Sequence, residues 1–101
     1  MIEYGHFIGG KAIAGKSGKT ADVFQPMDGT VRAKVALASK AEVRTSVEVA
    51  LKAQPAWAAT NPQRRARVLM KYVDLLNRDM DKLADCLARE HGKTVADAKG
   101  D

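Results

Sequence analysis

Two short stretches of the sequence carry the residue types that bind phosphate. Gly15–Thr20 reads GKSGKT and Gly92–Thr94 reads GKT, and glycine-rich loops ending in Gly-Lys-Ser/Thr cradle nucleotide phosphates. That motif needs a further glycine five residues upstream, where this chain has Ile13 and Leu87. A helix must also follow the loop, but the residues from Ala21 onward alternate like a strand. We expect turn and cap chemistry here and no nucleotide site.

Cys86 and the two histidines are the remaining candidates for nucleophilic or metal chemistry. Cys86 lies beside an apolar helical stripe with no base to activate its thiol, so we expect a buried or half-buried structural cysteine. His6 and His91 lie near opposite ends of the chain without neighbouring ligands, so a metal site has no support. His91 is expected in the last turn of a helix, where a cation complements the dipole. We expect no catalytic, cofactor-binding or metal-ligating residue within 1–101.

The net charge of +5 raises the alternative of a basic module that binds nucleic acid or an acidic protein. The basic residues fall in separate segments, around Lys16 and at Arg64, Arg65 and Arg67, and aromatic residues are not interleaved with them. The three arginines open a helix, where the dipole disfavours cations; solvation explains them more simply than an acidic partner surface. We therefore expect solvated faces and no nucleic acid.

Length and composition indicate at most one soluble domain. The chain has 101 residues, of which 46% are hydrophobic and 29% charged, which argues against disorder. No apolar run approaches the roughly 20 residues of a membrane span, and no secretory or organelle leader is visible at the N-terminus. A single cysteine fits a reducing compartment, so a cytoplasmic protein without a membrane partner is expected.

The first part of the chain, residues 1–38, has the features of hairpins and strands. Residues 6–8 and 11–13 flank Gly9-Gly10, a dipeptide that suits a tight hairpin turn. Thr20–Phe24 reads as a strand ended by Pro26, in a turn that Gly29 completes. Residues 30–37 alternate with a period of two. One face of this expected strand carries Val31, Ala33, Val35 and Leu37.

The second part, residues 39–101, has the 3.6-residue period of helices. Ser39 and Glu42 form a capping box, and the helix that they open carries an apolar stripe. That stripe comprises Val43, Val47, Ala50, Leu51 and Trp57. We expect Trp57 to be a core anchor and Pro55 to kink the helix or end it early.

A second helical stretch follows, with a break near residues 77–79. Asn61 is the expected N-cap, with Pro62 at the first position. The apolar seam consists of Leu69, Val73, Leu76, Met80, Leu83 and Leu87. Asp79 could cap the segment after the break, Gly92 is placed to end it in a left-handed turn, and Thr94 to start another helix. The fold class is thus α/β, with strands followed by two to three amphipathic helices. A helix beginning so near Asp101 leads us to expect an incomplete domain.

Five segments, in this order, resemble the aldehyde dehydrogenase superfamily. They are His6–Lys11, Phe24–Val31, Ala53–Trp57, the stretch from Arg64 through Arg67 to Leu69, and Glu90–Lys93. They are similar to that family's F-I-x-G hairpin, N-P-x-x-G turn, tryptophan-bearing helix, arginine-led helix and E-x-G-K helix end. Gln25 stands where the turn more often has asparagine. Gln54–Trp57, Asn61–Val68 and Glu90–Asp101 resemble most closely the CoA-acylating methylmalonate-semialdehyde dehydrogenase branch.

The resemblance implies the N-terminal piece of a longer enzyme, with both parts of this chain in its NAD-binding domain region. Such an enzyme attacks its aldehyde with a cysteine thiolate, reduces NAD, and in this branch releases propionyl-CoA or acetyl-CoA after decarboxylation. Its nucleophile and its NAD-contacting residues would lie beyond Asp101, and Cys86 does not match the nucleophile's motif. The resemblance further implies a homo-oligomer that acts on a small semialdehyde. The piece alone is expected to be inactive and to bind no cofactor. Another branch, forming a free acid, is the nearest alternative.

Overall fold

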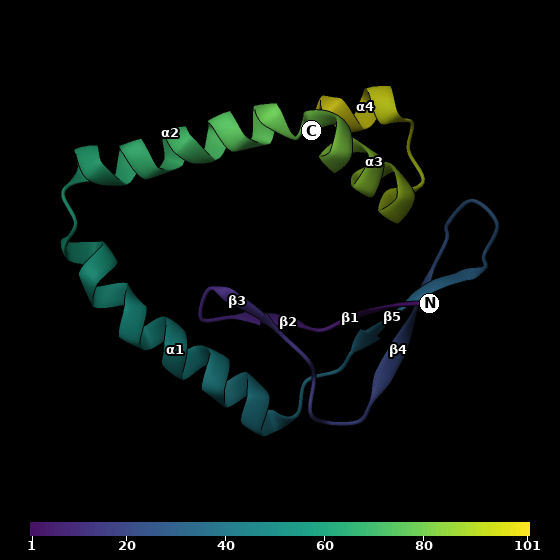
Figure 1. Ribbon diagram of the computed structural model, residues 1–101, viewed down its shortest axis with the longest axis horizontal. Helices are drawn as coiled ribbons and strands as arrows, with labels where there is room; N and C mark the ends of the chain where they lie inside the picture. The colour runs from purple at the N-terminus through teal and green to yellow at the C-terminus, as the bar shows by residue number, and fades with distance from the viewer. The chain divides into compact units, whose positions relative to one another are not determined.

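A computed structural model describes all 101 residues, which form two compact units. The first unit comprises Met1–Phe24 and Val31–Ala59, and the second comprises Gln25–Thr30 and Thr60–Asp101. Figure 1 shows the strands and helices in chain order. The strands end at Ala36 and the helices begin at Lys40, close to the predicted change of period. The compact units, however, divide between the first two helices.

The first unit contains a three-stranded sheet in the order β1-β5-β4. Its strands are β1 (Ile2–Tyr4), β4 (Thr20–Phe24) and β5 (Val31–Ala36). The middle strand β5 runs parallel to β1 and antiparallel to β4, so Ala33 has a neighbour on either side and is fully buried. Leu37 lies beyond the strand and is 44% exposed, so the predicted apolar face is shorter than expected.

The predicted hairpin is confirmed. Strands β2 (His6–Ile8) and β3 (Lys11–Ile13) pair antiparallel, and φ is 65° at Gly9 and 80° at Gly10. Two successive positive φ angles match the right-handed twist of the flanking strands. A side chain at Gly9 would meet Val49 Cγ1 at 3.7 Å, so this turn lies against the first helix. Strand β1, by contrast, was not predicted.

Helix α1 (Lys40–Ala59) completes the first unit and corrects two expectations. The helix continues past Pro55 to Ala59, so of the two predicted effects of this proline, a kink or an early end, the early end is wrong: the missing N–H removes one helical hydrogen bond without ending the helix. Trp57 is 44% exposed and is not a core anchor. No residue of α1 is buried, because nothing in its unit covers the apolar stripe.

The second unit begins with the turn Gln25–Thr30. The Gln25 N–H donates to the Thr30 carbonyl at 2.7 Å, and φ is 74° at Gly29. The Asp28 carboxylate accepts hydrogen bonds from the Thr30 N–H at 3.0 Å and from its hydroxyl at 2.7 Å. The predicted turn is therefore confirmed.

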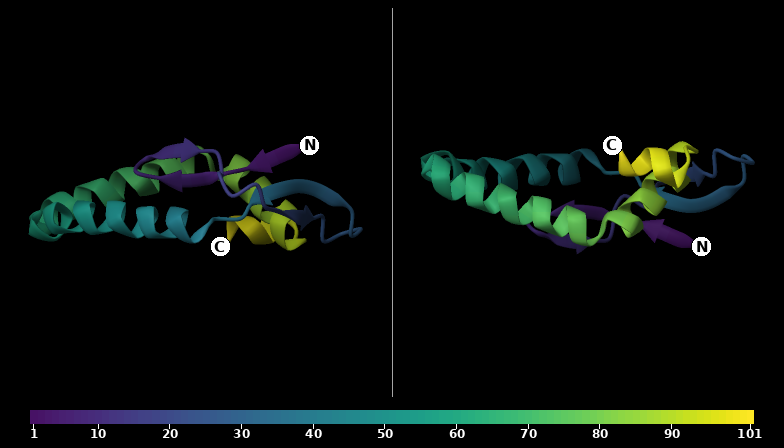
Figure 2. Two further views of the ribbon diagram at one scale, coloured as in Figure 1. Left: turned by 90° about the horizontal axis from the view of Figure 1, so that it is seen from below. Right: turned by 90° about the horizontal axis from the view of Figure 1, so that it is seen from above.

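Three helices make up the rest of this unit: α2 (Pro62–Arg78), α3 (Met80–His91) and α4 (Val95–Lys99). The Asn61 side chain caps α2 by accepting from the Gln63 N–H at 2.8 Å. The chain changes direction between α2 and α3, and α4 lies beside α3 (Figures 1 and 2). The break falls at Asp79 as predicted, but its carboxylate does not cap α3; it accepts from the Arg78 guanidinium at 2.9 Å.

Both helix boundaries predicted near the C-terminus are confirmed. Gly92 ends α3 with φ 89° and donates its N–H to the Ala88 carbonyl at 2.8 Å. The Thr94 hydroxyl oxygen caps α4 by accepting from the Asp97 N–H at 3.2 Å.

The buried core consists of alanine alone. Ala33, Ala84 and Ala98 are buried, and no large side chain is fully buried. Because a core is normally built from large apolar side chains, most of the apolar surface of this chain faces solvent. None of the helices combines the length and the apolar character that a membrane span requires.

Candidate functional site

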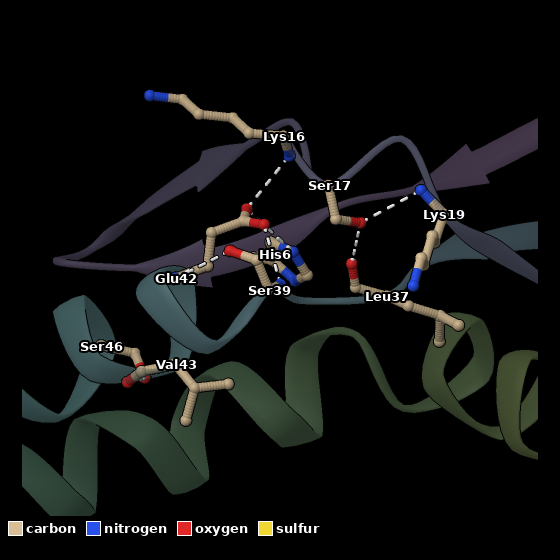
Figure 3. A network of polar contacts seen from close by, with 9 residues as sticks. All are labelled: His6, Lys16, Ser17, Lys19, Leu37, Ser39, Glu42, Val43 and Ser46. Atoms are coloured by element: carbon tan, nitrogen blue, oxygen red, sulfur yellow. Dashed lines mark hydrogen bonds and ion pairs between the residues drawn. The ribbon is translucent and has the colours of Figure 1, made fainter.

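The clearest cluster of polar side chains surrounds Glu42 in the first turn of α1 (Figure 3). Its Oε1 accepts from the Ser39 N–H at 3.0 Å, and its Oε2 accepts from the Lys16 N–H at 3.1 Å. The Ser39 Oγ accepts in return from the Glu42 N–H at 3.1 Å, which confirms the predicted capping box. His6 Nε2 lies 3.5 Å from Glu42 Oε2. The carboxylate thereby joins strand β2, the loop before β4 and the start of α1.

These contacts favour the ionised form of Glu42. The hydrogen bond from the Ser39 N–H, and next that from the Lys16 N–H, hold the pKa of the Glu42 carboxyl below its ordinary value. The charge that His6 carries when protonated acts in the same direction. Hydrogen bonds to a charged group are stronger than those between neutral partners. The network therefore fastens the hairpin and the loop to α1 through an anion that has two backbone donors.

The lysine-rich loop is held by a second serine. Ser17 Oγ donates to the Leu37 carbonyl and accepts from the Lys19 N–H at 3.1 Å. Strand β4 begins directly afterwards at Thr20, so no helix N-terminus follows this loop. That confirms the prediction that Gly15–Thr20 is turn chemistry. The other Gly-Lys-Thr stretch leads into α4, and the Thr94 hydroxyl caps that helix by accepting from the Asp97 N–H. This stretch, too, shows the predicted cap chemistry.

The other candidate residues, Cys86, His91 and the three arginines, do not form a common site. Cys86 is exposed, and the prediction of a buried or half-buried cysteine is wrong. Each helical residue turns by about 100°, so Cys86, one residue before Leu87, points outside the apolar stripe. His91 lies in the last turn of α3 and the three arginines lie in the first turns of α2, both as predicted. No group of three or more His, Cys, Asp or Glu residues is placed to hold a metal ion.

Sequence reasoning missed the meeting of His6 with Glu42. His6 lies in β2 and Glu42 in α1, and no sequence pattern near either residue indicates that their side chains are in contact. Gly15 marks the same junction: a Cβ there would lie 2.6 Å from Ala36 Cβ and 3.4 Å from His6 Nε2. A glycine within a polar loop is the one sequence signal for such close packing, and it does not identify the partner. Because the Ser17 and Ser39 oxygens are engaged with backbone groups, this cluster positions elements and presents no nucleophile.

The sequence and the structure of this chain are similar to those of known proteins. The family model described as "Aldehyde dehydrogenase family" matches residues 13–101. The chain is similar to the crystal structure, in complex with NAD, of a protein from Sinorhizobium meliloti 1021 that is described as a "putative methylmalonate-semialdehyde dehydrogenase". The identity is 60%, the TM-score is 0.94, and the match covers 99% of this chain and 20% of that one.

Two further methylmalonate-semialdehyde dehydrogenases are similar over nearly the whole chain. The structure from Oceanimonas doudoroffii shares 33% identity with a TM-score of 0.92, covering 99% of this chain and 20% of that one. The acylating methylmalonate-semialdehyde/malonate-semialdehyde dehydrogenase of Homo sapiens is 39% identical over 94% of this chain and 18% of its own length. The chain thus spans about a fifth of the length of these relatives.

Proposed function

This chain belongs to the aldehyde dehydrogenase family and corresponds to the N-terminal part of its members. We propose that the complete protein is an NAD-dependent, CoA-acylating dehydrogenase of malonate or methylmalonate semialdehyde. The observation that carries the proposal is the 60% identity, over 99% of this chain, with the Sinorhizobium meliloti enzyme whose structure contains NAD. The relative from Homo sapiens is named as an acylating enzyme, which supports coenzyme A as the acceptor. Both relatives support the substrate class.

The proposed reaction balances with coenzyme A as the acyl acceptor. Malonate semialdehyde, coenzyme A and NAD⁺ would give acetyl-CoA, carbon dioxide and NADH; methylmalonate semialdehyde would give propionyl-CoA. The aldehyde carbon is oxidised, its hydride goes to NAD⁺, and the carboxylate leaves as carbon dioxide. The methylene carbon keeps the electron pair of the broken bond and takes up the proton that the coenzyme A thiol releases.

The residues of this chain would serve as scaffold in that enzyme. Glu42, Ser39 and His6 join the hairpin to α1. We propose that the loop before Thr20 does not hold the cofactor's phosphates, because it leads into a strand and so lacks the helix N-terminus of a phosphate-binding loop. We therefore assign no step of hydride or acyl transfer to this chain, and none to Cys86. We further propose that the complete protein is a cytoplasmic homo-oligomer.

The test is an assay of the complete product of the gene that encodes this chain. Incubation with either semialdehyde, NAD⁺ and coenzyme A is expected to release NADH, and mass spectrometry is expected to detect the acyl-CoA. A free acid formed without coenzyme A would place the protein in another branch of the family. If neither semialdehyde led to release of NADH, the proposed substrate class would be refuted. Residues 1–101 alone are expected to release no NADH, and turnover by them would contradict the scaffold role.

A further inference from the structure

The turn between β4 and β5 contains the one aspartate of the sequence that is followed by glycine, Asp28-Gly29. Such a pair is prone to a rearrangement of the backbone, because glycine has no side chain to hinder attack of its nitrogen on the preceding carboxyl group. Both residues are exposed, and φ at Gly29 is 74°, which glycine adopts without steric cost. The pair thus combines the residue types and the exposure that the rearrangement needs.

The rearrangement is a condensation within the chain, followed by hydrolysis. The Gly29 nitrogen attacks Cγ of Asp28 in its carboxylic acid form, a C–N bond forms, and the nitrogen proton leaves with the carboxyl OH group as water. Water then opens the cyclic imide. Opening at Cγ restores aspartate, whereas opening at the backbone carbonyl of residue 28 leaves the chain joined through Cγ, as isoaspartate. The water lost in the first step is regained in the second, and no other reactant is consumed.

The structure engages both reacting groups in other hydrogen bonds. Asp28 Oδ1 accepts from the Thr30 N–H at 3.0 Å and from the Thr30 hydroxyl at 2.7 Å. These two donors hold the pKa of the Asp28 carboxyl below its ordinary value, and the ionised group is the less reactive form because it must gain a proton before oxygen leaves as water. The Gly29 N–H, which carries the nucleophile, donates to the Gln25 carbonyl at 2.8 Å. Thr30 therefore restrains the electrophile, and Gln25 restrains the nucleophile.

We propose that Asp28-Gly29 is a site of isoaspartate formation in this protein and that the Thr30 hydroxyl limits the rate. Ring closure requires the Asp28 carboxyl group to leave Thr30. Hydrogen bonds to a charged group are stronger than those between neutral partners, so loss of this hydroxyl should raise the population of the reactive conformation about tenfold. The proposal does not rest on the proposed function.

The modification would change the turn and its packing. Isoaspartate adds one carbon atom to the backbone between residues 28 and 29. The turn is closed by the Gln25 N–H, which donates to the Thr30 carbonyl at 2.7 Å. The turn also packs against the end of α3, since a Cβ on Gly92 would lie 3.3 Å from Pro26 Cβ. A longer backbone does not fit these two contacts together, so isoaspartate should loosen the turn from the end of α3.

Ageing of the complete protein tests the proposal. The native protein and Thr30→Val, which keeps the branched side chain and loses the hydroxyl, are incubated near neutral pH and digested with trypsin. Cleavage after Lys19 and Arg32 releases a peptide that contains both Asp28 and Asp22, in which electron-transfer fragmentation locates isoaspartate. Asp22 precedes a valine and is the internal control. Thr20→Val, the same change outside the turn, is the matched control variant. Synthetic peptides of this sequence with threonine or valine at position 30 give the rates without the fold.

We expect isoaspartate at Asp28 and none at Asp22. It should accumulate about tenfold faster in Thr30→Val than in the native protein or in Thr20→Val, while the two peptides react at equal rates. Equal rates in the native protein and Thr30→Val, or equal acceleration in Thr20→Val, would overturn the role of the hydroxyl. An Asp28 that stays unmodified in both proteins while the peptides react would overturn the site.

A second comparison needs no substitution. The native protein should form isoaspartate more slowly than the synthetic peptide of the same sequence, because only the folded turn holds the carboxylate on Thr30 and the Gly29 N–H on Gln25. Formation as fast in the native protein as in the peptide would show that these hydrogen bonds do not restrain the reaction, and would overturn the proposed control by the turn.

Discussion

Replacing Ser39 by alanine tests whether the capping box holds the start of α1. The substitution removes the oxygen that accepts from the Glu42 N–H at 3.1 Å, while Glu42 Oε1 can still accept from the backbone N–H of residue 39 at 3.0 Å. Loss of one N-cap hydrogen bond costs about 1 kcal/mol. In a local opening equilibrium, 1 kcal/mol corresponds to about a fivefold change. We therefore expect the Glu42 amide hydrogen to exchange about fivefold faster in Ser39→Ala.

Residue-resolved hydrogen exchange measures this effect without requiring global two-state unfolding. Ser46→Ala is the matched control: the Ser46 hydroxyl donates to the Val43 carbonyl at 2.7 Å inside the helix. Alanine has the higher helix propensity, so exchange at Glu42 should stay the same or slow down. The Gln63 amide, capped by Asn61 in the other unit, serves as an internal reference. Equal acceleration of Glu42 exchange in both variants, or none in Ser39→Ala, would refute the capping argument.

Other perturbations address the junctions and the exposed surface. Gly15→Ala should destabilise the first unit by about 1 to 3 kcal/mol, because the new Cβ would lie 2.6 Å from Ala36 Cβ; an unchanged melting temperature would contradict this close packing. Gly92→Ala should lower the melting temperature as well, since φ is 89° and the new Cβ would lie 3.3 Å from Pro26 Cβ. A left-handed non-glycine residue costs about 1 to 2 kcal/mol. Acidification should loosen the start of α1: the lowered pKa of Glu42 adds stability above the ordinary carboxyl pKa, and this is lost as the pH falls through the lowered value. The protection of the Lys16 amide, expressed relative to the intrinsic exchange rate at the same pH, should decrease as the pH falls below the ordinary carboxyl pKa in the native chain but not in Glu42→Gln. Residues 1–101 alone should self-associate or pack loosely because of their exposed apolar faces; a monomer with a sharply cooperative melt in ultracentrifugation and calorimetry would contradict this.

Elements with a strong local signal were predictable from the sequence. The Gly9-Gly10 hairpin follows from residues that accept positive φ angles. The starts of α1 and α2 follow from the hydrogen bonds that Ser39 and Asn61 make with nearby backbone groups. In each case the partners lie within a few residues of one another. Hydrogen bonds and backbone preferences at such short range can therefore be predicted from the sequence.

Burial was less predictable than secondary structure. The apolar stripe of α1 has the predicted period, yet Trp57 is exposed, because burial depends on a second surface that the first unit does not supply. For Cys86 the error has another source, the angular position on α3, which leaves the thiol facing solvent. Strand β1 escaped notice because a three-residue strand carries no periodic pattern and is defined by its distant partner β5.

The sequence by itself determined where turns and caps fall, and its ordered segments pointed to the aldehyde dehydrogenase family. The tertiary structure alone decided that His6 meets Glu42 and that Ala33, Ala84 and Ala98 form the whole buried core. It also decided that side chains of α2, α3 and α4 line an apolar groove in the second unit. The physical reason is range: a cap or a turn is settled by neighbouring residues, whereas burial and long-range contacts depend on how distant segments meet.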